Sequence, residues 1–174
     1  DYQNARVLCF DLKKLGSGHR KIAVLGGPVT SYPSLMRRQG AQQAMEDAGI
    51  VFNDKLYGLS NYDFESAYHA MNSLLARRAE FTALFAMSDV IAFGAIRALV
   101  SAGLRVPEDV SVIGFDGITM SRYCVPVMTT IVQPSEQIAL QSIELLVRQI
   151  EHGSPAQTVT LQPELQQGES VRAI

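Results

Sequence analysis

The sequence predicts an α/β fold in which a parallel β-sheet is flanked by helices. Short apolar segments alternate along the chain with segments whose apolar residues recur at helical spacing. The apolar segments are unbroken, which is typical of strands buried on both faces of a parallel sheet. Several of them end in a polar residue, at the edge where open parallel sheets bind ligands. The 174 residues, 47% of them hydrophobic, suffice for one globular domain or two small lobes.

The bulk composition excludes some functions for this stretch of chain. The net charge of −2 and the lack of a long Lys/Arg run give no reason to expect nucleic-acid binding by these residues themselves. No apolar segment approaches the roughly 18 residues that span a bilayer. Cys9 and Cys124 lie far apart and predict two buried free thiols in a reducing, cytoplasmic compartment. The start at Asp1, without an initiator Met, predicts a fragment or a processed product.

The first third of the chain predicts two helices around one strand. Helical spacing covers residues 2–15, and Gly16-Ser17-Gly18 ends that helix. A strand over 21–25 follows and stops at Gly26-Gly27-Pro28. A second helix covers 34–48, with an apolar side formed by Leu35, Ala41, Ala44, Met45 and Ala48.

Arg37 is unusual because it lies on this apolar side. Ala41, Ala44 and Ala48 follow it at helical spacing, so its guanidinium faces the core near the start of the helix. A buried guanidinium is costly unless it is paired or reaches a wet cleft. The spacing leaves both interpretations open: a ligand-binding arginine, or a structural ion pair.

The middle of the chain predicts two further strand–helix units. A strand over 55–58 precedes the cap residues Ser60-Asn61 and a strongly periodic helix over 64–75. A strand over 82–86 leads to Ser88-Asp89 and a helix over 89–99. Helix capping alone would explain Ser88 and Asp89.

The last third begins with the strand that organises the prediction. The strand over 110–115 runs into Asp116, which places a carboxylate where a buried core ends and a cleft begins. A strand over 128–132 ends in Gln133, and a helix over 135–151 follows. Two short strands, 157–161 and 164–170, complete the expected elements.

Catalytic motifs are missing from the sequence. His19, His69 and His152 stand in no metal-ligand spacing, and no Gly-x-Ser-x-Gly, His-Glu-x-x-His or Walker sequence occurs. No Gly-x-Gly-x-x-Gly follows a strand, which disfavours a dinucleotide enzyme. We therefore expect binding without turnover, no metal and no cofactor.

Five sequence motifs resemble the lactose-repressor (LacI/GalR) family of bacterial transcription regulators, in the order and spacing of that family. The fourth is highly specific. They are Gly18-His19-Arg20-Lys21-Ile22-Ala23, Arg37-Arg38-Gln39-Gly40, Ala86-Met87-Ser88-Asp89, residues 106–116 (Val-Pro-Glu-Asp-Val-Ser-Val-Ile-Gly-Phe-Asp) and Thr129-Thr130-Ile131-Val132-Gln133-Pro134.

The resemblance implies a ligand site. Arg37 matches the family's effector-binding arginine, and Asp116 matches the aspartate that accepts hydrogen bonds from effector hydroxyls or amines. Tyr62 matches an aromatic residue that lies against the ligand ring, and Gln133 matches the crossover residue between the lobes. The ligand-binding set is completed by Ser88, where Asn is usual, and its neighbour Asp89. Such a set suits a sugar. Departures at Ser88, Ala67, Gly117 and Gly168 put the identity of the effector in doubt.

The resemblance also implies a fold and a domain division. The fold is a periplasmic-binding-protein-like (type I) core, of which this chain holds mainly the C-terminal lobe. Residues 1–132 belong to that lobe, 133–157 return to the N-terminal lobe, and 158–174 form final strands in the C-terminal lobe. The helix-turn-helix head would be missing. The expected protein is a cytoplasmic homodimer whose sugar effector controls operator binding through that head.

Three alternatives remain open from the sequence. A periplasmic sugar-binding protein of a transport system shares the fold and would carry a signal peptide in place of a DNA-binding head. An α/β enzyme would use Asp116 and Arg37 for turnover. Within the family, a phosphoprotein partner could replace the sugar as effector.

Overall fold

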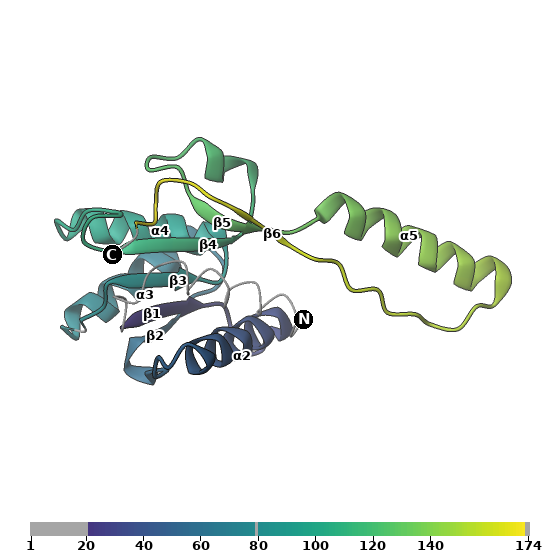
Figure 1. The fold of residues 1–174 in the computed structure, drawn as a ribbon, viewed down its shortest axis with the longest axis horizontal. Coiled ribbons are helices and arrows are strands. Elements are labelled where there is room, and N and C mark those ends of the chain that lie inside the picture. The colour runs from purple at the N-terminus through teal and green to yellow at the C-terminus, as the bar shows by residue number, and fades with distance from the viewer. Residues whose placement is uncertain (1–20, 79, 173–174) are drawn as a thin grey trace.

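The architecture is a six-stranded, mostly parallel sheet flanked by helices, as predicted. The computed structural model describes residues 21–78 and 80–172. The strands lie in the order β2-β1-β3-β4-β5-β6, and only β6 runs antiparallel, against β5 (Figure 1). Their bounds are β1 Ile22–Gly26, β2 Tyr57–Leu59, β3 Ala83–Ala86, β4 Ser111–Asp116, β5 Thr129–Val132 and β6 Glu164–Gln166.

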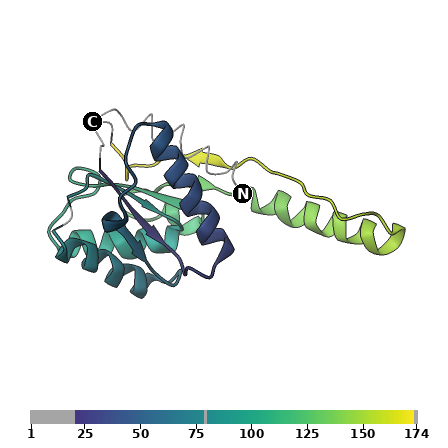
Figure 2. The same ribbon diagram turned by 90° about the horizontal axis from the view of Figure 1, so that it is seen from below.

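Helices cover both faces of the sheet because the connections change direction. The helices are α2 Tyr32–Asp47, α3 Phe64–Ala76, α4 Asp89–Ser101 and α5 Ser135–His152. The connection from β1 to β2 runs toward one edge of the sheet, whereas those from β2 to β3 and from β3 to β4 run toward the other. Right-handed crossovers then place α2 on one face and the packed pair α3 and α4 on the other (Figure 2).

The core explains why the apolar segments are unbroken. Every residue of β1 and β3, and all of β4 except Asp116, is buried. The central strands have helices on both faces, so most residues on both sides of these strands are apolar. The largest fully buried side chains include Phe85, Leu25, Met71, Leu99 and Ile131.

Most predicted helices and strands are present with small shifts at their ends. The helix predicted over 34–48 begins two residues earlier, because Ser31 accepts a hydrogen bond from the Ser34 amide and caps it. Leu35, predicted on its apolar side, is exposed. The predicted helix 2–15, with Cys9, lies outside the described residues. Cys124 is a free thiol and is only partly buried.

The strand predicted over 55–58 is wrong in its first half. Asn53 accepts a hydrogen bond from the Lys55 amide and starts a short 3-10 turn, η1 (Asp54–Leu56), so β2 begins only at Tyr57. The cap of α3 was also predicted wrongly. Asp63 caps α3 by accepting from the Ser66 amide at 2.7 Å, whereas the hydroxyl of Ser60 donates to the Gly26 carbonyl.

The two predicted C-terminal strands are corrected to one. Residues 157–161 form no strand, and only Glu164–Gln166 of the predicted 164–170 pairs, as β6. A strand needs a neighbour to accept its backbone hydrogen bonds. Residues 157–161 run beside α5, away from the sheet, and have no strand beside them (Figure 1).

Candidate functional site

The predicted ligand residues gather at the carboxyl edge of the sheet. β1 runs into Gly27, β3 runs into Ser88, and β4 ends at Asp116. Connections leave β1 and β3 toward opposite edges of the sheet, so these two neighbouring strands form its topological switch point. Ligands of open α/β sheets bind in the crevice outside such a point.

Arg37 and Asp116 form an ion pair at this edge. The Arg37 Nη2 atom donates to Asp116 Oδ1 at 3.0 Å, and their side chains are only 16% and 26% exposed. The same guanidinium donates to the Met87 carbonyl and lies 3.9 Å from the centroid of the Phe115 ring. Helix α2 thus delivers Arg37 toward the core side, as its spacing predicts. Arg37 therefore forms an ion pair, and its partner Asp116 is itself a predicted ligand residue, so the ion pair does not exclude a role in ligand binding.

Gln133 joins the same carboxylate from the chain that leaves β5. Its Nε2 donates to Asp116 Oδ1 at 2.7 Å. Both donors therefore converge on Oδ1, and no hydrogen bond to Oδ2 is present within 21–78 and 80–172. The site keeps one carboxylate oxygen available to a hydroxyl or amine donor.

Burial raises the pKa of Asp116 above its usual value, and the Arg37 charge and the hydrogen bonds from Arg37 and Gln133 offset this only in part. A raised pKa means that the folded chain holds this proton more tightly than the unfolded chain does. The ion pair with Arg37 is therefore lost progressively as pH falls from neutral through the raised value.

We expect the affinity of a ligand that donates a hydrogen bond to Asp116 to follow this protonation. Affinity should be constant near neutral pH and then fall by about tenfold per pH unit below the raised pKa, because a protonated Asp116 loses its charge and an acceptor. Calorimetric titration across pH would measure the slope. Asp116→Asn should bind weakly at all pH values. If Asp116→Asn kept the wild-type dependence of affinity on pH, a group other than Asp116 would be responsible for it.

Tyr62 packs against the end of β1. A Cβ atom at Gly27 would lie 2.1 Å from the Tyr62 ring, so only glycine allows this contact. Tyr62 itself has φ of +60°, and its hydroxyl is buried without a hydrogen-bond partner in the described part of the chain. The structure therefore brings Tyr62 to the same edge as Arg37 and Asp116.

The side chains of Ser88 and Asp89 make different contacts. Ser88 caps α4 by accepting from the Ile91 amide at 3.1 Å, as capping predicts. Asp89 is 0% exposed, accepts from the Ile118 amide at 2.8 Å, and also accepts from the Thr130 hydroxyl. Both of its oxygens are thus engaged inside the protein, which gives Asp89 a structural position beneath the site.

Three features of the site were not singled out from the sequence. The Met87 carbonyl and the Phe115 ring hold Arg37, and Ser34 donates to the Gly27 carbonyl at 3.1 Å. A backbone carbonyl leaves no signal in a sequence. Ser34 could have been found from the sequence, because it is three residues before Arg37 and therefore lies on the same face of the helix.

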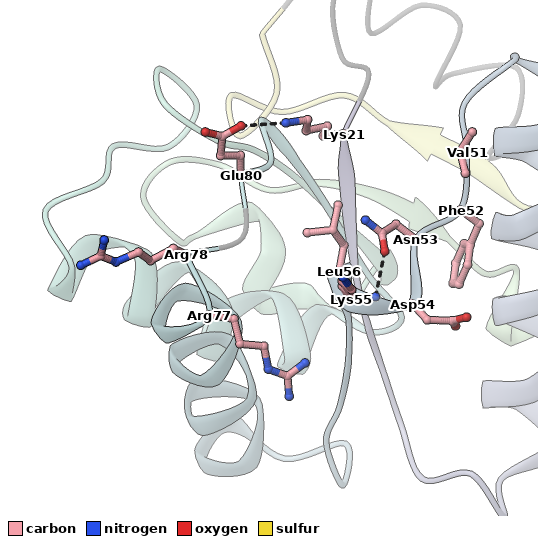
Figure 3. A pocket seen from close by; sticks show the side chains of 10 residues that line it. All are labelled: Lys21, Val51, Phe52, Asn53, Asp54, Lys55, Leu56, Arg77, Arg78 and Glu80. Atoms are coloured by element: carbon pink, nitrogen blue, oxygen red, sulfur yellow. Dashed lines mark hydrogen bonds and ion pairs between the residues drawn. The ribbon is translucent and has the colours of Figure 1, made fainter.

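Two cavities lie near the sheet, one away from this site and one that borders it at Gln133. One, of about 990 Å³, is lined by the η1 segment and by residues at the amino-terminal side of β1 and β3, where Lys21 pairs with Glu80 at 2.7 Å (Figure 3). The other, of about 350 Å³, lies between α5 and residues 157–163, and Gln133 and Pro134 also line it. Neither holds Arg37 or Asp116. Within the described residues no group of three His, Cys, Asp or Glu side chains forms a metal site.

Residues 14–171 match the model of a family described as a periplasmic binding protein-like domain. The chain belongs to this family. Its similarity to repressors confirms the resemblance to LacI/GalR regulators. It is 36% identical, over 92% of its length, to an HTH-type transcriptional repressor PurR from Histophilus somni, of which it covers 48%. The relatives are transcriptional repressors, which agrees with the prediction of a non-enzyme.

Solved structures of LacI-family regulators have the same fold as this chain. A sugar-binding LacI-family regulator from Escherichia coli, in complex with phosphate, superposes with a TM-score of 0.90 at 32% identity, over 99% of this chain and 62% of that one. A Lac repressor dimer bound to operator and an anti-inducer superposes with a TM-score of 0.89 at 25% identity, over 98% and 58%. The chain spans about half the length of the relatives it matches.

No helix in the described part of the chain has both the length and the apolar character needed to cross a membrane.

Proposed function

We propose that this chain is the sugar-binding part of the effector core of a LacI-family transcription regulator. The observation that carries the proposal is the partly buried Asp116 carboxylate, which is paired with Arg37 at the switch point of the sheet and has an unengaged oxygen. A carboxylate and a guanidinium fix sugar hydroxyls by directional hydrogen bonds, and the Tyr62 ring supplies a face for C–H groups. The sugar-binding regulator of the same fold supports this choice of ligand.

The ligand set that we propose is Arg37, Asp116, Tyr62, Ser88 and Gln133. Asp89, which the family resemblance placed in the set, supports the site from below without touching the ligand.

We further propose the domain division that the resemblance implies. Residues 1–132 and the C-terminal residues 158–174 build one lobe, and 133–157 belong to a second lobe formed by the rest of a longer protein. The position of α5 supports this division, because α5 stands away from the sheet (Figure 1). None of its residues is buried, although its apolar side chains recur at helical spacing.

An effector bound between two lobes would favour their closure. In a cytoplasmic homodimer, closure would change the spacing of two DNA-binding heads on a pseudo-palindromic operator. Coupling of this kind needs a difference in affinity between two arrangements, typically about 1–3 kcal/mol. The operator-bound Lac repressor dimer of the same fold supports this assembly.

A chemical-shift titration of the chain tests the sugar proposal. D-ribose, D-glucose, cellobiose and hypoxanthine are added to isotopically labelled protein, and side-chain signals of Arg37 and Gln133 are followed. We expect saturable shifts of both side chains with at least one sugar. In an Arg37→Leu variant only the Gln133 signal remains, and it should shift only at roughly 100-fold higher sugar concentration. Shifts with hypoxanthine alone would replace sugar by nucleobase as the ligand class. No saturable shift with any of the four would refute a sugar site.

The exposed apolar face of α5 predicts self-association of the isolated chain. Ile138 and Leu146 are exposed and Leu145 is partly buried, in line with a face that normally packs on another lobe. Burying a leucine stabilises an association by about 1.5–3 kcal/mol, so Leu146→Glu should raise the dissociation constant at least tenfold. Sedimentation equilibrium measures this. Gln137→Glu adds the same charge on the opposite side of α5, nine residues before Leu146, and should leave association largely unchanged. Equal effects of both variants would contradict the prediction.

A further inference from the structure

Asp116 has a backbone conformation that its neighbours must impose. Its φ is +112°, a region that residues with a side chain rarely adopt, and Gly117 follows with φ of +71°. Such conformations persist only where the surroundings over-determine them. A Cβ atom at Gly117 would also lie 2.7 Å from the Val132 Cα atom, so the turn is pressed against β5. Some contact must hold this turn in place.

The Asp89 carboxylate supplies that contact. Its Oδ2 accepts a hydrogen bond at 2.8 Å from the Ile118 amide, two residues after Asp116. Its Oδ1 accepts from the Thr130 hydroxyl on β5, the strand beside β4. One side chain on α4 therefore ties the end of β4 to β5, and it stands at the helix N-terminus, where the helix dipole favours an anion.

Gly114 on β4 leaves space for the Asp89 carboxylate because it has no side chain. A Cβ atom at Gly114 would lie 2.3 Å from Asp89 Oδ1 and 3.3 Å from the Thr130 hydroxyl oxygen. Gly114 is the direct cross-strand partner of Thr130. Burial and, to a smaller extent, the Asp116 charge raise the pKa of Asp89, whereas the Thr130 hydroxyl and the Ile118 and Gly117 amides act in the opposite direction. The groups that hydrogen-bond to Asp89 are thus donors, which suits a carboxylate.

We propose that Asp89 is a positioning residue. It holds the Gly117–Ile118 turn so that the strained backbone of Asp116 presents its carboxylate to Arg37. It does this without contacting the ligand. The functional meaning of this role rests on the proposed function of Asp116, but the positioning itself requires no ligand and is measured without one.

The test compares Asp89→Ala and Asp89→Asn with Ser170→Ala in the whole chain. Asparagine offers one acceptor oxygen to two donors, so it should lose part of the effect. Ser170 is a matched control. It is 0% exposed, its hydroxyl donates to the Val112 carbonyl at 2.6 Å and accepts from the Thr129 amide at 2.8 Å. It therefore also joins β4 and β5, but away from the Asp116 turn.

Two readouts separate positioning from general stability. The first is hydrogen exchange of the Ile118 amide relative to the slowest amide of β3. The second is the resolved side-chain NMR signal of the paired Arg37 guanidinium. In Asp89→Ala we expect Ile118 to exchange at least about tenfold faster on this relative scale, and the Arg37 signal to broaden or average. Ser170→Ala should change neither, although it destabilises the fold.

The proposal is overturned if the Ile118 and β3 amides accelerate together in the Asp89 variants, or if the Arg37 signal is unchanged. Should both Asp89 variants fail to fold, Thr130→Val decides. It removes the donor to Oδ1 and with it the tie to β5, so Ile118 should exchange faster relative to β3 and the Arg37 signal should broaden. If both readouts were unchanged in a folded Thr130→Val variant, the proposal would be overturned. If the positioning readouts behave as expected and no sugar binds the wild-type chain, the proposed function fails and the positioning role stands.

Discussion

Replacing Arg37 with leucine is expected to weaken sugar binding by roughly 100-fold. Hydrogen bonds to charged groups contribute about 1.5–3 kcal/mol each, and Arg37 is the only cation that the structure places in contact with Asp116 among the described residues. Its removal leaves a carboxylate that is only 26% exposed without a counter-charge, so the pKa of Asp116 rises further and the group tends to protonate. Calorimetric titration with the sugar that binds the wild-type chain measures the loss.

The neighbouring arginine provides the control. Arg38 is on the same helix but pairs with Asp54 at 2.8 Å, and the Asp54 side chain is mostly exposed. Exposed ion pairs contribute little to stability, so Arg38→Leu should leave sugar affinity within about twofold of wild type. If both variants lost the same affinity, Arg37 would be important for α2 in general and not for the ligand.

Replacing Gly114 with alanine is expected to destabilise the fold by about 3 kcal/mol or more. The added Cβ would lie 2.3 Å from a buried carboxylate oxygen that is fixed by hydrogen bonds to β5 and the 116–118 turn. Overpacking costs about 1–3 kcal/mol, and each buried hydrogen-bonding group left unsatisfied adds a similar amount. Urea unfolding measures the change in the free energy of unfolding, with the dependence of that free energy on urea concentration (the m-value) held equal for both proteins.

Gly58→Ala on β2 is the matched control for this steric argument. A Cβ atom there would meet the Leu25 Cδ2 atom at 2.6 Å, which is the far end of a flexible side chain and can move aside. We expect a loss below about 1.5 kcal/mol. If Gly58→Ala destabilised the chain as much as Gly114→Ala, the cost would come from β-strand crowding and not from the Asp89 carboxylate.

The central strands and the α-helices of the described residues could be predicted because apolar residues in continuous or periodic patterns leave a direct trace in the sequence. An unbroken segment such as 110–115 must be covered on both faces, and periodic segments such as 64–75 must be covered on one. The strand predicted at 157–161 failed for the opposite reason. A strand exists only if a partner accepts its hydrogen bonds, and a local pattern does not show whether a partner is there.

The candidate site also contains features that the sequence predicted and features that it did not. Helical spacing placed Arg37 on the core side of its helix, and the end of an apolar strand placed Asp116 at the sheet edge. Spacing did not reveal that these side chains form an ion pair, and motif resemblance set Asp89 among the ligand residues. The difference between Asp89 and Asp116 depends on which amides and hydroxyls surround each carboxylate, and those groups come from α4, β4 and β5.

The sequence alone determined the α/β class, the succession of described helices and central strands, and the family to which the chain belongs. Those features follow from local periodicity and short motifs, which need no knowledge of distant contacts. Only the tertiary structure decided that Arg37 and Asp116 are partners, that both oxygens of the buried Asp89 accept hydrogen bonds inside the protein, and that α5 stands apart from the sheet. These depend on contacts between residues far apart in the chain, and the free energy of such contacts is set by packing and desolvation in three dimensions.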